Sequence, residues 1–65
     1  MKRTNLKIKI IENNLTQKEL AKRIGVSSQA ITDYINGNYN PKFEVMQKIA
    51  AELNSTVDEL FFTRS

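Results

Sequence analysis

The sequence predicts an all-α fold in which five short helices form one domain over residues 1–65. Its apolar residues recur at the three- and four-residue spacing of helices rather than at the two-residue spacing of strands. Two capping boxes, at Thr16 and Thr56, each place a glutamate three residues after a threonine and mark the start of a helix. Gly25 and Gly37 follow apolar stripes and are expected to end helices.

The first helix is expected over about Asn5–Asn13, and the second begins after the Thr16 cap and ends at Gly25. Each has apolar residues at helical spacing that should face the core. In the first helix these are Leu6 and Ile10, with Ile8 and Ile11 widening the same face. In the second helix they are Leu20, Ala21 and Ile24.

The third helix begins at Ser27 or Ser28, either of which can cap it, and runs to about Asn36. A polar loop leads to a fourth helix over about Lys42–Leu53, and the capping box at Thr56 opens a last short helix. The inward-facing residues of the third helix are expected to be Ala30, Ile31, Tyr34 and Ile35. Those of the fourth are Val45, Met46, Ile49, Ala50 and Leu53, and those of the last are Val57, Leu60 and Phe61.

The composition excludes several kinds of chemistry. The chain has no cysteine and no histidine, which removes disulfides, thiolate metal sites and the usual general base. Its two glycines are too few for a phosphate-binding loop. We therefore expect no enzyme activity, no metal or other cofactor and no small-molecule ligand. No apolar run approaches the ~20 residues of a membrane span, so we expect a soluble, cytoplasmic protein.

The charge is unevenly distributed along the chain. The net charge is +3, yet residues 1–23 carry seven basic and two acidic side chains, whereas residues 24–65 are net negative. A basic part of this kind suits a polyanionic partner, although solvated surface lysines explain the charge equally well.

The stretch Leu15–Asn36 is the most informative part of the chain. It holds two helix signatures joined at Gly25 by a turn too short for an antiparallel pair. The two helices must therefore cross steeply, and the second protrudes from the body of the domain. A protruding helix that opens with small polar residues has the shape needed to enter the major groove of DNA.

The outward side of the third helix supplies candidate base contacts. The amide of Gln29 can pair two ways with adenine N6 and N7, and the carboxylate of Asp33 can accept from cytosine N4. Each residue alone is better explained as a cap or a surface residue, but their position together on the second of two crossed helices favours DNA. The expected base-contacting residues are Ser27, Ser28, Gln29, Thr32 and Asp33.

Backbone contacts are expected on either side of that helix. Gln17 sits in the first turn of the second helix, where free backbone N–H groups and the side-chain amide can hold a phosphate. The polar loop after the third helix also suits phosphate contacts, although a plain connector would be polar too. The expected backbone-contacting residues are Thr16, Gln17, Asn36, Asn38, Asn40 and Lys42.

A pattern known from one protein family runs through about Leu6–Phe61. Its segments, Leu15–Ala21, Ile24–Ser27, Gln29–Ile31, Gly37–Pro41, Ile49–Ala50 and Val57–Phe61, resemble the phage-repressor and Cro-like helix-turn-helix family, also called the xenobiotic-response-element type. The resemblance implies a compact, lambda-repressor-like bundle of five helices with the helix-turn-helix in helices 2 and 3. It also implies binding to double-stranded DNA, usually as a dimer on a two-fold operator.

The chain departs from this family at two buried positions. Many relatives pair an arginine of the first helix with a glutamate near the end of the third, whereas this chain has Ile10 and Ile35 there. Matched apolar residues often replace a buried ion pair without loss of stability. We therefore expect these two isoleucines to touch.

A homodimer is expected for two further reasons. One groove helix reads about four base pairs, or roughly 256 sequences, which is too few to select one site in a genome. The last helix also carries more large apolar residues than it can bury, which suggests a dimer interface at Phe61 and Phe62. The alternative is that Phe62 folds back on the core of its own chain.

The sequence thus indicates a sequence-specific transcriptional regulator, more specifically a repressor that binds a palindromic operator as a homodimer. One alternative is an antitoxin-like or regulatory module whose acidic back face binds another protein. Another is an accessory protein of a phage or mobile element that binds DNA without regulating transcription.

Overall fold

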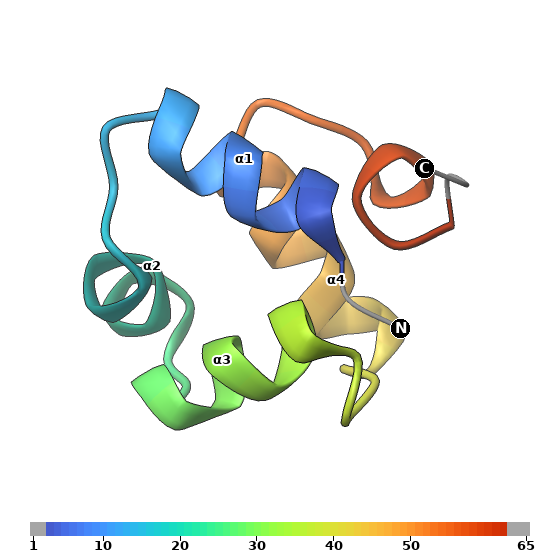
Figure 1. Cartoon of the computed structure of the whole chain (residues 1–65), viewed down its shortest axis with the longest axis horizontal. Coiled ribbons are helices and arrows are strands. Elements are labelled where there is room, and N and C mark those ends of the chain that lie inside the picture. The colour runs from blue at the N-terminus through green and yellow to red at the C-terminus, as the bar shows by residue number, and fades with distance from the viewer. Residues whose placement is uncertain (1–2, 63–65) are drawn as a thin grey trace.

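The computed structural model describes residues 3–62, which are all-helical apart from their connections (Figure 1). The elements in chain order are α1 (Thr4–Glu12), α2 (Gln17–Ile24), α3 (Ser28–Asn36), α4 (Phe43–Glu52) and a π-helical turn, η1 (Asp58–Phe62). The predicted all-α fold of five helices is confirmed. Each predicted boundary agrees with the observed one to within two residues, which is the usual spread at fraying helix ends.

The starts of α2 and α3 follow from local side-chain capping. The Thr16 hydroxyl oxygen accepts from the Glu19 backbone N–H at 3.1 Å, and the Glu19 carboxylate accepts from the Thr16 N–H at 3.0 Å. The Ser27 hydroxyl oxygen accepts from the Ala30 N–H at 3.1 Å and caps α3 in the same way. Each bond satisfies a backbone donor that has no partner within the helix.

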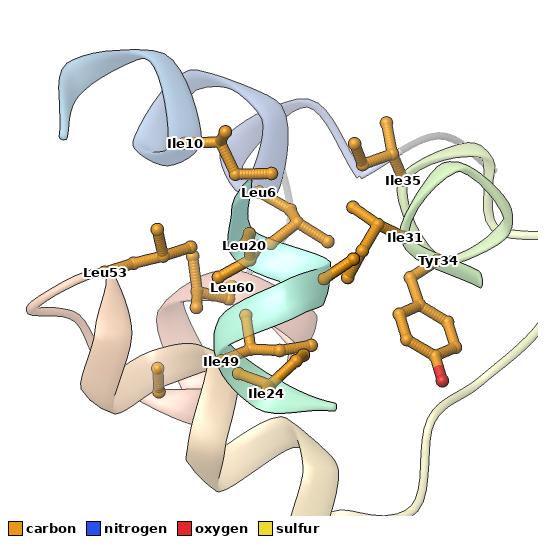
Figure 2. Packing of buried hydrophobic residues seen from close by; sticks show 12 residues of the cluster. Leu6, Ile10, Leu20, Ile24, Ile31, Tyr34, Ile35, Ile49, Leu53 and Leu60 are labelled. Carbon is orange, nitrogen blue, oxygen red and sulfur yellow. The ribbon is translucent and has the colours of Figure 1, made fainter. Parts of the chain in front are cut away.

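The core lies where α1, α2, α3 and α4 meet, and η1 closes it from the side of α1 (Figures 1 and 2). Every helix contributes at least one buried apolar side chain to this core. Removal of this surface from water is the main stabilising contribution in a chain without disulfides. The side chains with less than 2% exposure are Leu6, Leu20, Ile31, Ile49 and Leu53.

The expectation for Ile8 and Ile11 is wrong. Their exposed fractions are 44% and 62%, so they do not widen the inner face of α1. Leu6 and Ile10 define that face, and a step of two residues turns an α-helix by about 200°. Ile8 therefore points away from Leu6, and Ile11 lies beyond the edge of the buried stripe.

The two isoleucines that replace the familial ion pair are both buried. Ile10 is 3% exposed and Ile35 is 6% exposed, and both belong to the same apolar cluster (Figure 2). The apolar replacement is therefore accommodated, because neither residue leaves a buried polar atom behind. Direct contact between Ile10 and Ile35 stays a prediction.

Candidate nucleic-acid interface

The turn between α2 and α3 sets the geometry of the candidate interface. It consists of Gly25, Val26 and Ser27, and Gly25 ends α2 with a left-handed φ of 79°. No atom lies within 4 Å of the place where a Cβ would stand, so glycine is needed there for its backbone conformation and not for space. In Figure 1 α2 is seen almost end-on while α3 lies across the view, which shows their steep crossing.

The structure brings the five predicted base-contacting residues onto one outer face of α3. Ser27, Ser28 and Gln29 are exposed, and Thr32 and Asp33 are half-buried. The opposite face of α3 carries Ile31 and Ile35, which are buried. We call the face made by Ser27, Ser28, Gln29, Thr32 and Asp33 the outer face of α3.

A hydrogen bond joins this outer face to the start of α2. The Thr32 hydroxyl donates to the Gln17 side-chain oxygen at 2.8 Å, across the turn between the two helices. The bond uses the oxygen end of the Gln17 amide and leaves its NH2 group as a donor. Gln17 is the first residue of α2, so this donor lies beside the free backbone N–H groups of the helix start.

The capping role of Thr16 and Ser27 is compatible with the predicted contacts of their hydroxyl groups, which stay a prediction. Thr16 and Ser27 each accept a backbone hydrogen bond through a lone pair of the hydroxyl oxygen. A hydroxyl has one proton to donate besides its lone pairs. The capping bonds therefore leave an O–H donor on each side chain, and both side chains are exposed.

The end of α3 and the loop between α3 and α4 hold the remaining predicted backbone contacts. Asn38, Asn40 and Lys42 are exposed and Asn36 is half-buried. Asn40 differs from the others because its side-chain oxygen accepts from the Arg3 guanidinium, so its NH2 group is the end left for other contacts.

Arg3 is a residue that sequence reasoning missed. Its guanidinium donates to the Tyr34 carbonyl at 2.5 Å and to Asn40, and it lies 5.4 Å above the Phe61 ring. Arg3 thus joins the start of α1 to the end of α3, to the loop and to η1. No local signal predicts this role, because the hydrogen-bond partners lie more than 30 positions along the chain.

Two stacked tyrosines join the loop to α3. The Tyr39 ring, which is exposed, stacks on the Tyr34 ring of α3 with centroids 5.9 Å apart and an interplanar angle of 20°. Burial raises the pKa of the Tyr34 phenol, with smaller contributions from Tyr39 and Asp33. Tyr34 is therefore neutral at pH 7, which suits its place in the core.

Some basic side chains form ion pairs with acidic side chains of the same chain, and others do not. Arg23 pairs with Glu52 at 3.3 Å and Lys9 with Glu12 at 3.5 Å. By contrast, four exposed lysines form no ion pair within residues 3–62, and their charge is available to an external anion. They are Lys7, Lys18, Lys22 and Lys42.

The two terminal phenylalanines lie in different surroundings. Phe61 is half-buried under the Arg3 guanidinium, whereas the Phe62 side chain is 61% exposed. The alternative that Phe62 folds back on the core of its own chain is therefore wrong. Phe62 is therefore an exposed apolar side chain at the end of η1.

Other kinds of site find little support in the described part of the chain. Residues 3–62 contain no group of three acidic, histidine or cysteine side chains that is placed to hold a metal ion. Over the same residues, none of the helices combines the length and the apolar character needed to span a bilayer.

Comparison with known proteins places the chain in a family. A family model described as Helix-turn-helix matches residues 6–60. An uncharacterized HTH-type transcriptional regulator from Archaeoglobus fulgidus is 39% identical over 59 residues, which make up 91% of this chain and 83% of that relative.

Solved structures agree with this placement. The N-terminal DNA-binding domain of SinR, the master biofilm regulator of Bacillus subtilis, matches with a TM-score of 0.79 and 25% identity over 98% of this chain and 94% of that domain. SinR solved in complex with DNA matches with a TM-score of 0.78 and 26% identity over 92% of this chain and 97% of that one. A chain in the complex of SinR with SinI also matches, but this protein spans only 61% of that chain, against 94% of the DNA-binding domain.

A third protein shares the fold. The restriction-modification controller protein C.AhdI from Aeromonas hydrophila matches with a TM-score of 0.79 and 24% identity, over 89% of this chain and 84% of that protein. On the family match and the identity to the Archaeoglobus relative, the chain belongs to the Cro/CI-type helix-turn-helix family of DNA-binding transcriptional regulators.

Proposed function

We propose that this chain is a sequence-specific repressor that binds a palindromic operator as a homodimer. The observation that carries the proposal is the outer face of α3, which is polar, exposed at Ser27, Ser28 and Gln29, and half-buried at Thr32 and Asp33. Repression needs no reaction, because a bound protein blocks access of the polymerase to the promoter.

In this proposal the outer face of α3 enters the major groove and reads base edges. The amide of Gln29 pairs with adenine, and the neighbouring hydroxyl and carboxylate groups contact adjacent bases. The Gln17 amide and the start of α2 hold a phosphate on one side of the groove. The side chains proposed to hold the backbone are Thr16, Gln17, Asn36, Asn38, Asn40 and Lys42.

Affinity in this proposal comes from outside α3. That helix has no lysine or arginine and carries the acidic Asp33, so it supplies no attraction to phosphate. The unpaired lysines, which include Lys18 and Lys22 on α2, supply the electrostatic attraction. Base readout and backbone attraction therefore depend on different residues, which mutations can separate.

Selection from random duplexes tests the operator. We expect the parent protein to enrich a palindrome whose half-sites lie ~34 Å apart. Gln29→Ala should weaken binding to that palindrome by ~1–3 kcal/mol and relax preference at one base pair, whereas Lys18→Ala should weaken all sequences alike. Gln47→Ala is the matched control, because Gln47 is an exposed glutamine on α4, away from the outer face of α3. Equal losses for Gln29→Ala and Gln47→Ala would remove Gln29 from the interface.

Sedimentation tests the dimer. We place Phe61 and Phe62 at the subunit contact, because Phe62 is the large apolar residue that η1 leaves in solvent. At micromolar concentration Phe62→Ser should sediment as a monomer and the parent as a dimer. Phe43→Ser is the matched control, because Phe43 is 60% exposed but lies at the start of α4. If the parent and Phe62→Ser sediment with the same molecular mass, Phe62 is excluded from the interface.

A second candidate function is recognition of another protein, as in an antitoxin-like module. The observations that favour it are the negative charge of α3 and the existence of a SinR–SinI complex among the structural matches. Salt dependence separates the two functions. A DNA-binding protein loses affinity with a slope of about −0.9 per phosphate contact in log K against log salt, whereas a protein-binding module shows little affinity for DNA even at low salt.

A further inference from the structure

Gln29 and Asp33 lie one turn apart on the outer face of α3 and form a side-chain pair. The Gln29 NH2 group donates to a carboxylate oxygen of Asp33 at 3.2 Å. Asp33 has no lysine or arginine within ion-pair distance among residues 3–62, so Gln29 is the side chain that it holds. We propose that Asp33 is a positioning residue that fixes which end of the Gln29 amide is the donor and thereby sets a preference for adenine over guanine.

The proposal follows from what each group can donate and accept. An ionised carboxylate only accepts hydrogen bonds, whereas a glutamine amide has an accepting oxygen and a donating NH2 group. Only one of the two orientations of the amide, related by a 180° rotation, places its NH2 group toward Asp33. The opposite orientation would bring the Gln29 oxygen against the carboxylate, which is repulsive.

The fixed amide presents one pattern to a base. The Gln29 NH2 group has two hydrogens, and the bond to Asp33 uses one of them. In the proposal Asp33 takes the hydrogen trans to the amide oxygen, so that the remaining cis hydrogen and the oxygen lie side by side as a donor and an acceptor. Adenine offers the complementary pair, an acceptor at N7 and a donor at N6, whereas guanine offers two acceptors at N7 and O6. With guanine, the O6 acceptor faces the Gln29 oxygen, which is also an acceptor, so no hydrogen bond forms between them.

The neighbouring pair between Thr32 and Gln17 shows why the carboxylate matters. A threonine hydroxyl both donates and accepts, so it tolerates either orientation of the Gln17 amide. Asp33 tolerates only one orientation of the Gln29 amide. The sequence suggested that the Asp33 carboxylate accepts from cytosine. One of its oxygens is engaged with Gln29, and the positioning of the Gln29 amide is a second role beside that contact.

The inference rests on the proposed function, so its test uses the duplex that the parent enriches. Binding is measured with adenine and with guanine at the base pair that Gln29→Ala relaxes. The parent should prefer adenine by ~5- to 140-fold, the range expected for one bidentate contact. Asp33→Asn should reduce this ratio at least about threefold, because asparagine can accept or donate and releases the amide. Asp33→Ser serves as a second variant if Asp33→Asn does not fold.

Two controls separate positioning from charge and from direct contact. Asp33→Asn also removes a negative charge near phosphate and should strengthen binding to every sequence, but this change cancels in the ratio. Glu44→Gln removes a charge from an exposed residue of α4 and should leave the ratio unchanged. In the Gln29→Ala background, Asp33→Asn should have no effect on the ratio.

The outcomes are distinct. An unchanged ratio in Asp33→Asn would overturn the inference and leave the proposed function standing. A ratio that changes equally with and without Gln29 would also overturn it, because Asp33 would then read the base directly. A parent that enriches no sequence would overturn the proposed function and the inference with it.

Discussion

The clearest test of the packing is Ile31→Ala. Ile31 is fully buried on the inner face of α3, and it points into the cluster that also holds Leu6, Leu20 and Ile49 (Figure 2). The outer face of α3 is held in place by this inner face. A loss of packing at Ile31 therefore measures how firmly the body of the domain supports the candidate interface.

The expected loss has two contributions. Ile31→Ala removes three buried carbon groups, and at ~0.8 kcal/mol each their transfer contributes about 2.4 kcal/mol. A residual cavity of about 50 Å³ adds roughly 1.2 kcal/mol at ~24 cal/mol per Å³. The total of about 3–4 kcal/mol is a large part of the ~3–10 kcal/mol expected for a domain of this size. A parent at the lower end of that range would bring the variant close to unfolding at room temperature.

Urea denaturation followed by far-UV circular dichroism measures this loss. Ile11→Ala is the matched control, because it makes the same chemical change at a residue of α1 that is 62% exposed. We expect Ile11→Ala to stay within about 0.5 kcal/mol of the parent. Equal free energies of unfolding for the two variants would refute the assignment of Ile31 to the core.

Three further predictions concern single positions. Gly25→Ala should lower the free energy of unfolding by about 1–2 kcal/mol, because alanine is strained at the left-handed φ of 79° although its Cβ would meet no atom. Thermal unfolding measures this loss, and a variant as stable as the parent would contradict the need for glycine at this turn. Ile35→Glu buries a carboxylate at a residue 6% exposed and should cost ~3–5 kcal/mol at pH 7. The loss of stability should be smaller at pH 4, where the carboxyl is protonated. A variant as stable as the parent at pH 7 would refute the burial of the side chain at position 35. The Ser55 hydroxyl, which donates to Glu59 at 2.6 Å, lowers the pKa of that carboxyl, so Ser55→Ala should raise this pKa in an NMR titration. Because the folded pKa is depressed, the stabilisation by Glu59 is present above its unfolded pKa and is lost as the pH falls through the folded value.

The local sequence was enough to place the helices and their ends. The capping box joins Thr16 and Glu19, three residues apart, and the Gly25 N–H donates to the Ala21 carbonyl, four residues back. A short window of sequence therefore contains each interaction. The buried stripe of α3, with Ile31 and Ile35, follows from helical spacing alone. The pair of Gln29 and Asp33 has the same local character, because its i, i+4 spacing was visible in the sequence.

Interactions between distant segments were decided by the tertiary structure. The link from Arg3 to Tyr34 and Asn40 and the bond from Thr32 to Gln17 join residues that only the packing of helices brings together. The exposure of Ile11 was also decided there, because an apolar side chain is buried only where a neighbouring helix covers it. Helical periodicity says which side of α1 is apolar, but the directions from which α3, α4 and η1 approach α1 determine how much of that side is covered.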